Sequence, residues 1–315
     1  MDMSTKKLRI VFLGTAAFGV PALEALIRSS HEVIGVVTSP DKPAGRGLHL
    51  SKSPVKLVAE QYHIPVWQPV KLKDPTFLAN MQALRPDLQV VVAFRMMPEA
   101  LWKLPPMGTI NIHASLLPDY RGAAPIQWAV INGETETGIT IFQLSHEIDT
   151  GDILAQSRVP ILPGETAGEL HDRLKIIGAE LLVKTIDDMV NHRLQPIPQQ
   201  QLIKPGMVLH PAPKIHKEDA RIHWDRPARE IVQLILGMNP SPVAWTLLDG
   251  KMLRIFRAHV CLPLSKPELP PGTLDTDGKT YLHFAGADGW VAVDELQLEG
   301  RKRLPVREFL KGFRG

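Results

Sequence analysis

The first 190 residues alternate short β-branched runs with segments that have the spacing of amphipathic helices. The runs that predict strands are 8–13, 31–38, 87–94, 108–113, 137–144 and 152–161. The segments that predict helices are 18–28, 54–62, 74–84, 123–132 and 166–191. Because such alternation produces parallel strands joined by right-handed crossovers, the sequence predicts a doubly wound α/β domain with a mostly parallel sheet.

A different pattern begins after residue 190. Residues 193–201 are rich in Pro and Gln, which predicts an extended linker over 191–210. One helical segment follows at 228–236, and the other runs predict short strands at 243–248, 251–260, 280–284 and 290–298. These runs predict a small antiparallel β-barrel, similar to an OB fold. We therefore expect an α/β domain in residues 1–190 and a barrel domain in residues 211–315.

The composition, with 44% hydrophobic and 22% charged residues, is typical of a soluble globular protein. No run approaches the roughly 20 apolar residues that a membrane-spanning helix needs. The N-terminal residues run directly into the first predicted strand without the pattern of a signal peptide, so we expect a cytoplasmic protein. The single cysteine, Cys261, excludes an intrachain disulfide and a multi-cysteine zinc site.

Two common cofactor signatures are missing from the sequence. The turn at 14–19 begins with Gly but lacks the G-x-G-x-x-G spacing of a dinucleotide site, and no phosphate-binding P-loop occurs. The histidines are scattered without the spacing of zinc ligands. We therefore expect neither a resident nucleotide cofactor nor a metal.

Three polar residues lie at or after the ends of predicted strands: Asn111, His113 and Asp149. Asn111 and His113 are two residues apart, so their side chains share one face of an extended chain. An amide and an imidazole can stabilise an oxyanion, while a carboxylate can fix the charge of the imidazole, order a water or accept a proton. Each residue alone could be an ordinary turn or strand-end residue. Together, at the carboxyl ends of strands, they predict acyl transfer.

Three motifs carry a resemblance to a known family. They are NIHASLLP over residues 111–118, YRGAAPIQ over 120–127 and DTGD over 149–152. With these motifs the chain resembles the methionyl-tRNA formyltransferase family of folate-dependent formyltransferases. The segments 214–224 and 239–245 resemble the opening of that family's C-terminal domain, so the resemblance spans nearly the whole chain.

The resemblance implies that a formyl group moves from 10-formyltetrahydrofolate, a cosubstrate, to the amino group of methionyl initiator tRNA. The family's catalytic residues correspond to Asn111, His113 and Asp149. Its folate-contacting residues correspond to Ser115, Leu116, Leu117 and Pro118 in one loop, and to Phe94, Met96 and Met97 in another. This second loop is one residue shorter than the commoner family pattern and carries Arg95.

The resemblance also implies contacts with tRNA. The family has a Pro-Ala-Gly-Arg-Gly loop that enters the tRNA acceptor stem, here at 43–47, which makes Lys42 and Arg46 candidates for RNA contact. The net charge of +3 is carried by residues 211–315. Candidate phosphate contacts in that region are Lys214, Lys217, Arg221, Lys251 and Arg254. We expect the enzyme to be a monomer without membrane contact.

Other functions share parts of this pattern. A formyltransferase for a sugar nucleotide or another small amine would use the same three groups, and a hydrolase would pass the formyl group to water. A non-catalytic RNA-binding protein would have no use for the three convergent groups. The loop at 43–47 and the mild C-terminal basic bias favour a tRNA acceptor.

Overall fold

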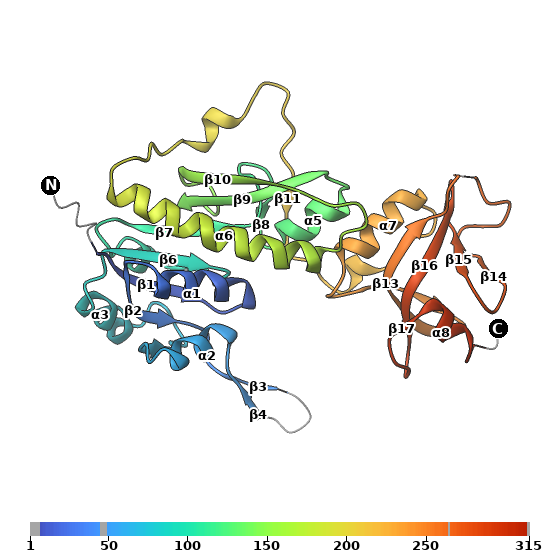
Figure 1. Cartoon of the computed structure of the whole chain (residues 1–315), viewed down its shortest axis with the longest axis horizontal. Coiled ribbons are helices and arrows are strands. Elements are labelled where there is room, and N and C mark those ends of the chain that lie inside the picture. The colour runs from blue at the N-terminus through green and yellow to red at the C-terminus, as the bar shows by residue number, and fades with distance from the viewer. Residues whose placement is uncertain (1–6, 45–48, 264, 314–315) are drawn as a thin grey trace. The chain divides into compact units, whose positions relative to one another are not determined.

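The computed structural model describes residues 7–44, 49–263 and 265–313 (Figure 1). The chain divides into two compact units. The first comprises Met1–Arg121, Gly138–Val159 and Asp172–His210, and the second comprises Gly122–Thr137, Pro160–His171 and Pro211–Gly315. The predicted RNA contact Arg46 lies outside the described residues.

A seven-stranded sheet forms the centre of the first unit (Figure 1). Its strands in spatial order are β10 (Ile153–Pro160), β9 (Glu136–Gln143), β7 (Thr109–His113), β6 (Leu88–Val92), β1 (Arg9–Gly14), β2 (Glu32–Val37) and β5 (Val66–Trp67). The strands from β7 to β5 run parallel, and β9 is antiparallel to β7. The predicted doubly wound, mostly parallel sheet is confirmed.

In the sequence, helices lie between the parallel strands, and one long helix comes after the last strand of the sheet. They are α1 (Val20–Arg28), α2 (Pro54–Gln61), α3 (Pro75–Ala83), α4 (Glu99–Trp102) and α6 (Ala167–Val190). Both α2 and α3 begin with Pro directly after a capping residue. The side chains of Ser53 and Asp74 accept hydrogen bonds from backbone N–H groups of the first turn. Local sequence signals therefore fix where these two helices start.

Alternate residues of the central strands pack against different helices. Val11 of β1 belongs to one cluster with Phe77 of α3 and Leu101 of α4. The next residue, Phe12, lies against Gly19, which precedes α1. Because neighbouring strand residues point to opposite faces, helices cover both faces of the sheet. Every residue of β6 is accordingly buried.

The second unit contains an antiparallel sheet. Its strands in order are β12 (Ala244–Leu248), β13 (Lys251–Val260), β16 (Trp290–Leu298), β15 (Leu282–Ala285) and β14 (Leu274–Thr276), with β17 (Leu304–Pro305) also beside β16. All of these pairs are antiparallel. Among the described strands β12 and β14 do not pair with each other, so the predicted barrel takes the form of a curled, open sheet.

Among the described residues, α5 (Pro125–Ile131), α7 (Ala228–Gly237) and α8 (Val306–Leu310) lie wholly in the second unit. Helix α5 packs against α7 although about 100 residues separate them, and Gly237 makes this possible. A Cβ at Gly237 would lie 2.4 Å from the Ile131 side chain. The close approach of two helices therefore depends on the missing side chain.

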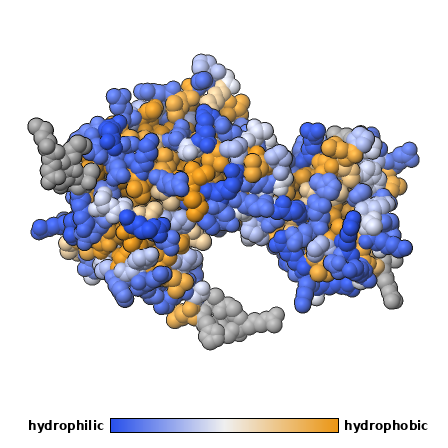
Figure 2. Space-filling view, in the orientation of Figure 1, coloured by the Kyte–Doolittle hydropathy of each residue, from blue (hydrophilic) through white to orange (hydrophobic). Residues whose placement is uncertain are grey.

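The remaining elements are short. They are the hairpin β3 (Lys42–Ala44) and β4 (His49–Ser51), the pair β8 (Arg121–Gly122) and β11 (Pro211–Ala212), and the 3-10 turns η1 (Ala17–Gly19), η2 (Gln199–Leu202) and η3 (Glu218–Ala220). Hydrophilic and apolar residues are interspersed over the face seen in Figure 2. Within the described ranges, no helix has both the length and the apolar character to cross a bilayer.

Candidate active site

The carboxyl end of β7 carries two of the three predicted catalytic residues. Asn111 and His113 alternate along the strand, so both side chains project to the same face. His113 is 6% exposed and Asn111 is half-buried. The Oδ1 atom of Asn111 is buried and makes no hydrogen bond within the described part of the chain. Since buried polar atoms are nearly always paired, this oxygen is a candidate acceptor for a hydrogen bond from a bound molecule.

The hydrogen bond of His113 defines its tautomer. Nε2 lies 2.9 Å from the backbone carbonyl oxygen of Tyr120. A carbonyl oxygen only accepts, so Nε2 carries the hydrogen and Nδ1 of the neutral ring is bare. Burial lowers the pKa of His113, against the opposing attraction of the Asp149 carboxylate. At neutral pH the ring is therefore uncharged, with its accepting nitrogen on the side of Asp149.

Asp149 reaches His113 from the loop between β9 and β10. Its Oδ2 atom lies 3.9 Å from Nδ1 of His113, and its side chain is 13% exposed. Its φ of +55° falls in the left-handed region, which Asp tolerates better than most residues. Two residues later Gly151 is required, because a Cβ there would lie 1.6 Å from the carbonyl oxygen of Gln143. The Asp-Thr-Gly motif thus encodes the turn that brings the carboxylate to the imidazole.

The predicted folate loop at 115–118 is largely buried. Ser115 is fully buried, and its hydroxyl donates to the carbonyl oxygen of Asp119 at 2.7 Å. Leu117 is 1% exposed, and its backbone N–H and carbonyl are both hydrogen-bonded to side chains of β9 and β10. Pro118 is buried as well, whereas Leu116 is half-buried. These contacts give the chain next to His113 a fixed shape.

The second predicted folate segment lies after β6. Phe94 and Met97 are half-buried against the first unit's core, while Met96 is 75% exposed. The guanidinium of Arg95 donates to the carbonyl oxygen of Val70 at 2.8 Å and to that of Pro69. Arg95 therefore joins this segment to the loop after β5. The two segments line a pocket of about 330 Å³, formed by Leu72, Lys73, Arg95, Met96, Met97 and Pro98.

Three of the predicted RNA contacts gather around one aromatic ring. Lys217 and Arg221 lie 5.9 and 5.7 Å from the ring centroid of Trp245. Arg254 stands directly opposite Trp245 in the register of β12 and β13, so the two side chains share a face. We call these four residues the Trp245 cluster. The other described candidates, each exposed, are Lys42, Lys214 and Lys251.

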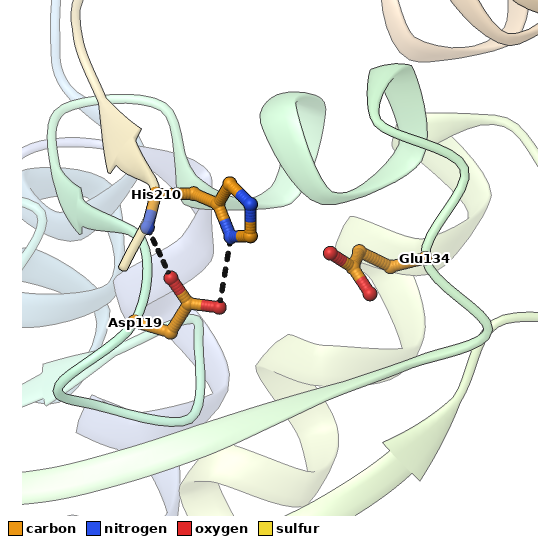
Figure 3. A group of neighbouring side chains, drawn as sticks. All are labelled: Asp119, Glu134 and His210. Atoms are coloured by element: carbon orange, nitrogen blue, oxygen red, sulfur yellow. Dashed lines mark hydrogen bonds and ion pairs between the residues drawn. The ribbon is translucent and has the colours of Figure 1, made fainter. Parts of the chain in front are cut away.

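A polar pair holds the end of the linker beside the site. The backbone N–H and ring Nδ1 of His210 lie 2.6 and 3.3 Å from the carboxylate oxygens of Asp119 (Figure 3). The His210 ring also stacks on Tyr120, with 5.3 Å between the centroids. Tyr120 is the residue whose carbonyl holds His113. The linker is therefore attached next to the predicted catalytic residues.

The sequence patterns did not indicate two residues of the candidate sites, Tyr120 and Trp245. Tyr120 acts through its backbone carbonyl, which no side-chain pattern reveals. Trp245 could have been found, because an aromatic residue on the polar face of a predicted strand, close to basic residues, is typical of nucleic-acid surfaces.

Comparison with known proteins identifies the family. The model of the family described as "Formyl transferase" matches residues 8–186, and "Formyl transferase, C-terminal domain" matches residues 214–314. A relative from Bacteroides thetaiotaomicron, named methionyl-tRNA formyltransferase, is 48% identical over 317 residues, which cover 99% of this chain and 98% of the relative. The chain belongs to the formyl transferase family. As a formyl transferase, it has the amide, imidazole and carboxylate of the predicted acyl-transfer set in its first unit.

Solved structures share the fold of this formyl transferase at lower identity. HypX from Aquifex aeolicus, in complex with tetrahydrofolic acid, is 21% identical with a TM-score of 0.64. The match covers 98% of this chain and 48% of HypX, so the chain spans about half the length of that protein. An N-formyltransferase from Helicobacter canadensis, in complex with folinic acid and dTDP-3-aminofucose, is 18% identical with a TM-score of 0.67, and the match covers 91% and 98% of the two chains. At these identities the likeness concerns the fold alone.

Proposed function

We propose that this formyl transferase moves the formyl group of 10-formyltetrahydrofolate to the amino group of methionine esterified to initiator tRNA, for translation initiation. The observation that carries the proposal is likeness over the full length. Relatives that bear the name methionyl-tRNA formyltransferase are 45% to 48% identical over 99% of the chain. The pairing of His113 with Asp149 supports the proposal, because formyl transfer needs a positioned proton acceptor and an oxyanion site.

The reaction begins with a neutral amine, because only a free lone pair can attack the formyl carbon. Free α-amino groups titrate at about 7.7 to 8.0, and esterification lowers their basicity further, so much of the substrate is neutral near pH 7. The main tasks of the site are then to position the amine and to stabilise the tetrahedral intermediate. The Asn111 amide is a donor for the oxyanion of that intermediate.

His113 accepts and returns the proton of the reaction, and Asp149 stabilises the charged ring. When the amine nitrogen bonds to the formyl carbon it must lose a proton, which the bare Nδ1 of His113 accepts. The resulting imidazolium is stabilised by the Asp149 carboxylate, 3.9 Å away, and adds a positive charge beside the oxyanion. When the bond from the formyl carbon to the folate nitrogen breaks, His113 returns the proton to that leaving nitrogen. The transfer needs no covalent enzyme intermediate.

We infer from the family resemblance that the folate donor contacts both predicted loops. Phe94, Met96 and Met97 offer an apolar and polarisable wall for a flat ring. The half-buried Leu116 packs on Gly138 of β9 and is the residue of this loop with surface left for the donor, while the hydrogen bonds of Ser115 and Leu117 hold the loop in shape. Arg95, where this chain departs from the commoner family pattern, lines the pocket itself, and its guanidinium is hydrogen-bonded to the loop after β5.

Two surfaces are proposed to contact tRNA. One contains Lys42 of β3 and, as the family resemblance implies, Arg46, which lies outside the described residues. The other is the Trp245 cluster, which combines a flat ring with three cations that suit an RNA backbone. Lys214 and Lys251 add charge to the same unit. Because charged initiator tRNA is a cytoplasmic molecule, we place the reaction in the cytoplasm, and we expect the enzyme to act as a monomer.

A comparison of acceptors tests the proposed function. The enzyme is mixed with 10-formyltetrahydrofolate and either methionyl initiator tRNA or a dTDP-linked amino sugar, and the formylated product is measured by mass spectrometry. We expect formyl-methionine on the tRNA and no formylated sugar. Transfer to the sugar alone would favour a small-amine formyltransferase, and release of formate alone would favour a hydrolase. Binding of tRNA without consumption of the donor would favour a non-catalytic RNA-binding protein.

A further inference from the structure

The segment that was predicted as a linker packs on the first unit. Ile197 and Ile153 exchange two backbone hydrogen bonds of 2.8 and 2.9 Å. Leu202 packs against the buried cluster that contains Leu117 and Phe142. Figure 1 shows this segment in yellow, after α6. Residues 197–202 are therefore part of a packed structure, although their composition is typical of an extended connector.

Gln199 is the most deeply buried polar residue of this segment. It has no exposed surface, and its side chain makes four hydrogen bonds. Nε2 donates to the carbonyl oxygens of Asp149 and Gly151 at 2.9 and 2.8 Å. Oε1 accepts from Nε and Nη2 of Arg121 at 3.1 and 2.6 Å. A glutamine amide has two N–H groups and two oxygen lone pairs, so these bonds use its whole capacity.

Two of the four bonds fix the backbone of the turn that carries Asp149, and the other two hold the guanidinium of Arg121. The carbonyl oxygens at Asp149 and Gly151 lie on both sides of Thr150, so holding them sets the direction of the Asp149 side chain. This matters because Asp149 adopts a φ of +55°, which is sparsely populated. On the other side, Arg121 directly follows Tyr120, whose carbonyl oxygen holds Nε2 of His113. One buried amide therefore links the supports of both residues.

We propose that Gln199 is a positioning residue for formyl transfer and that the linker is part of the active site. Gln199 acts through Asp149 and touches no reacting atom. The kinetic part of this inference rests on the proposed function. A displacement of about 1 Å at a catalytic group can cost about 100-fold in rate, so we expect loss of Gln199 to lower kcat by about 10- to 100-fold. The KM values for folate and tRNA should stay nearly unchanged.

A set of variants tests this role. Gln199→Met keeps the length of the side chain and removes all four hydrogen bonds, while Gln200→Met changes an exposed neighbour in the same 3-10 turn and is the matched control. We expect the control to match the wild type. The double variant Gln199→Met/Asp149→Asn should turn over no more slowly than Asp149→Asn alone, because both changes act at one group. Wild-type kcat in folded Gln199→Met, losses that multiply in the double variant, or a loss confined to KM would overturn the proposal.

A second measurement does not depend on formyl transfer. The attraction of Asp149 raises the pKa of His113 more than the repulsion of Arg121 lowers it. NMR titration of the His113 ring should therefore show a lower pKa in Gln199→Met, as in Asp149→Asn. An unchanged pKa would overturn the positioning role, whereas a lowered pKa in a protein that formylates no tRNA would support it and reject only the proposed function. Should Gln199→Met fail to fold, Gln199→Asn takes its place. This variant keeps the same donors and acceptor on a shorter side chain, and both its kcat and the pKa of its His113 are measured.

Discussion

At the residue scale, function depends on which nitrogen of His113 carries the hydrogen. The Tyr120 carbonyl accepts from Nε2, so Nδ1 is bare on the side of Asp149. In this state Nδ1 of His113 is a base, and this nitrogen becomes a donor only after it has taken a proton. That order suits attack by an amine, because the amine releases its proton before the folate nitrogen needs one.

The protonation state of His113 predicts how stability varies with pH. Burial lowers its pKa in the folded chain, whereas the unfolded histidine takes a proton below about pH 6.5. The unfolded state therefore binds more protons, and the free energy of unfolding should fall as the pH drops through about 6.5, by at most about 1.4 kcal/mol per pH unit from this group. The fall ends when the folded pKa is reached.

Denaturant titrations of the wild type and His113→Gln at about pH 7.5 and about pH 5.5 measure this effect. The variant lacks the titrating group at this position, so it should lose less stability between the two conditions. Equal losses in both proteins would mean that folded His113 binds its proton as readily as the unfolded residue.

At the element scale, the turn between β9 and β10 determines where Asp149 lies. Gly151→Ala would place a methyl group 1.6 Å from the carbonyl oxygen of Gln143, so the turn must move. We expect at least about a tenfold loss of kcat, because Asp149 would be displaced. Gly312→Ala is the control, since the nearest atom to its new methyl group would be 3.5 Å away. Steady-state formylation assays compare the two, and wild-type turnover in Gly151→Ala would contradict the role of this turn.

Helices and strands can be predicted from the sequence where capping residues, Pro residues or apolar runs mark them. Ser53 and Asp74 as caps, the Pro residues after them and the apolar run of β6 are all visible in the sequence. Contacts between distant residues are not. Helix α5 packs on α7, which lies about 100 residues further along the chain, and no local pattern indicates this contact.

The residues of the candidate site also differ in how far the sequence indicates them. Asn111, His113 and Asp149 can be predicted as candidates from their residue types and strand-end positions, and His113 and Asp149 lie close together in the structure. The sequence predicts Gln199 as part of a connector, since Gln and Pro are typical of linkers. Its burial depends on Asp149 and Arg121, which are 50 and 78 residues away along the chain. No local pattern can reveal such a contact.

At the scale of the whole molecule, donor chemistry and tRNA binding should respond differently to salt. Each cation that neutralises a phosphate releases counterions, so removing one should reduce the slope of log affinity against log salt by about 1. We expect Arg254→Ala to weaken tRNA binding several-fold at about 0.1 M salt and to reduce this slope, without changing the KM for folate. Filter binding over a range of salt concentrations measures both quantities.

The matched control for this prediction is Arg303→Ala. Arg303 lies in the same unit but already pairs with Glu295 and stacks over the Phe256 ring. Its removal should leave the salt slope unchanged. If Arg254→Ala and Arg303→Ala change the tRNA affinity and the salt slope equally, the Trp245 cluster is not a specific contact surface.

Single-turnover formylation tests the central claim most directly. Excess enzyme, as wild type or Asp149→Asn, is mixed with 10-formyltetrahydrofolate and methionyl initiator tRNA, and formyl-methionine is followed in time. We predict rapid product from the wild type and transfer slowed by about 100-fold or more in the variant, because proton transfer contributes about 10²- to 10⁴-fold to such reactions. Equal rates in both proteins, or wild-type enzyme that consumes the donor without formylating the tRNA, would contradict the assignment of this site and of its acceptor.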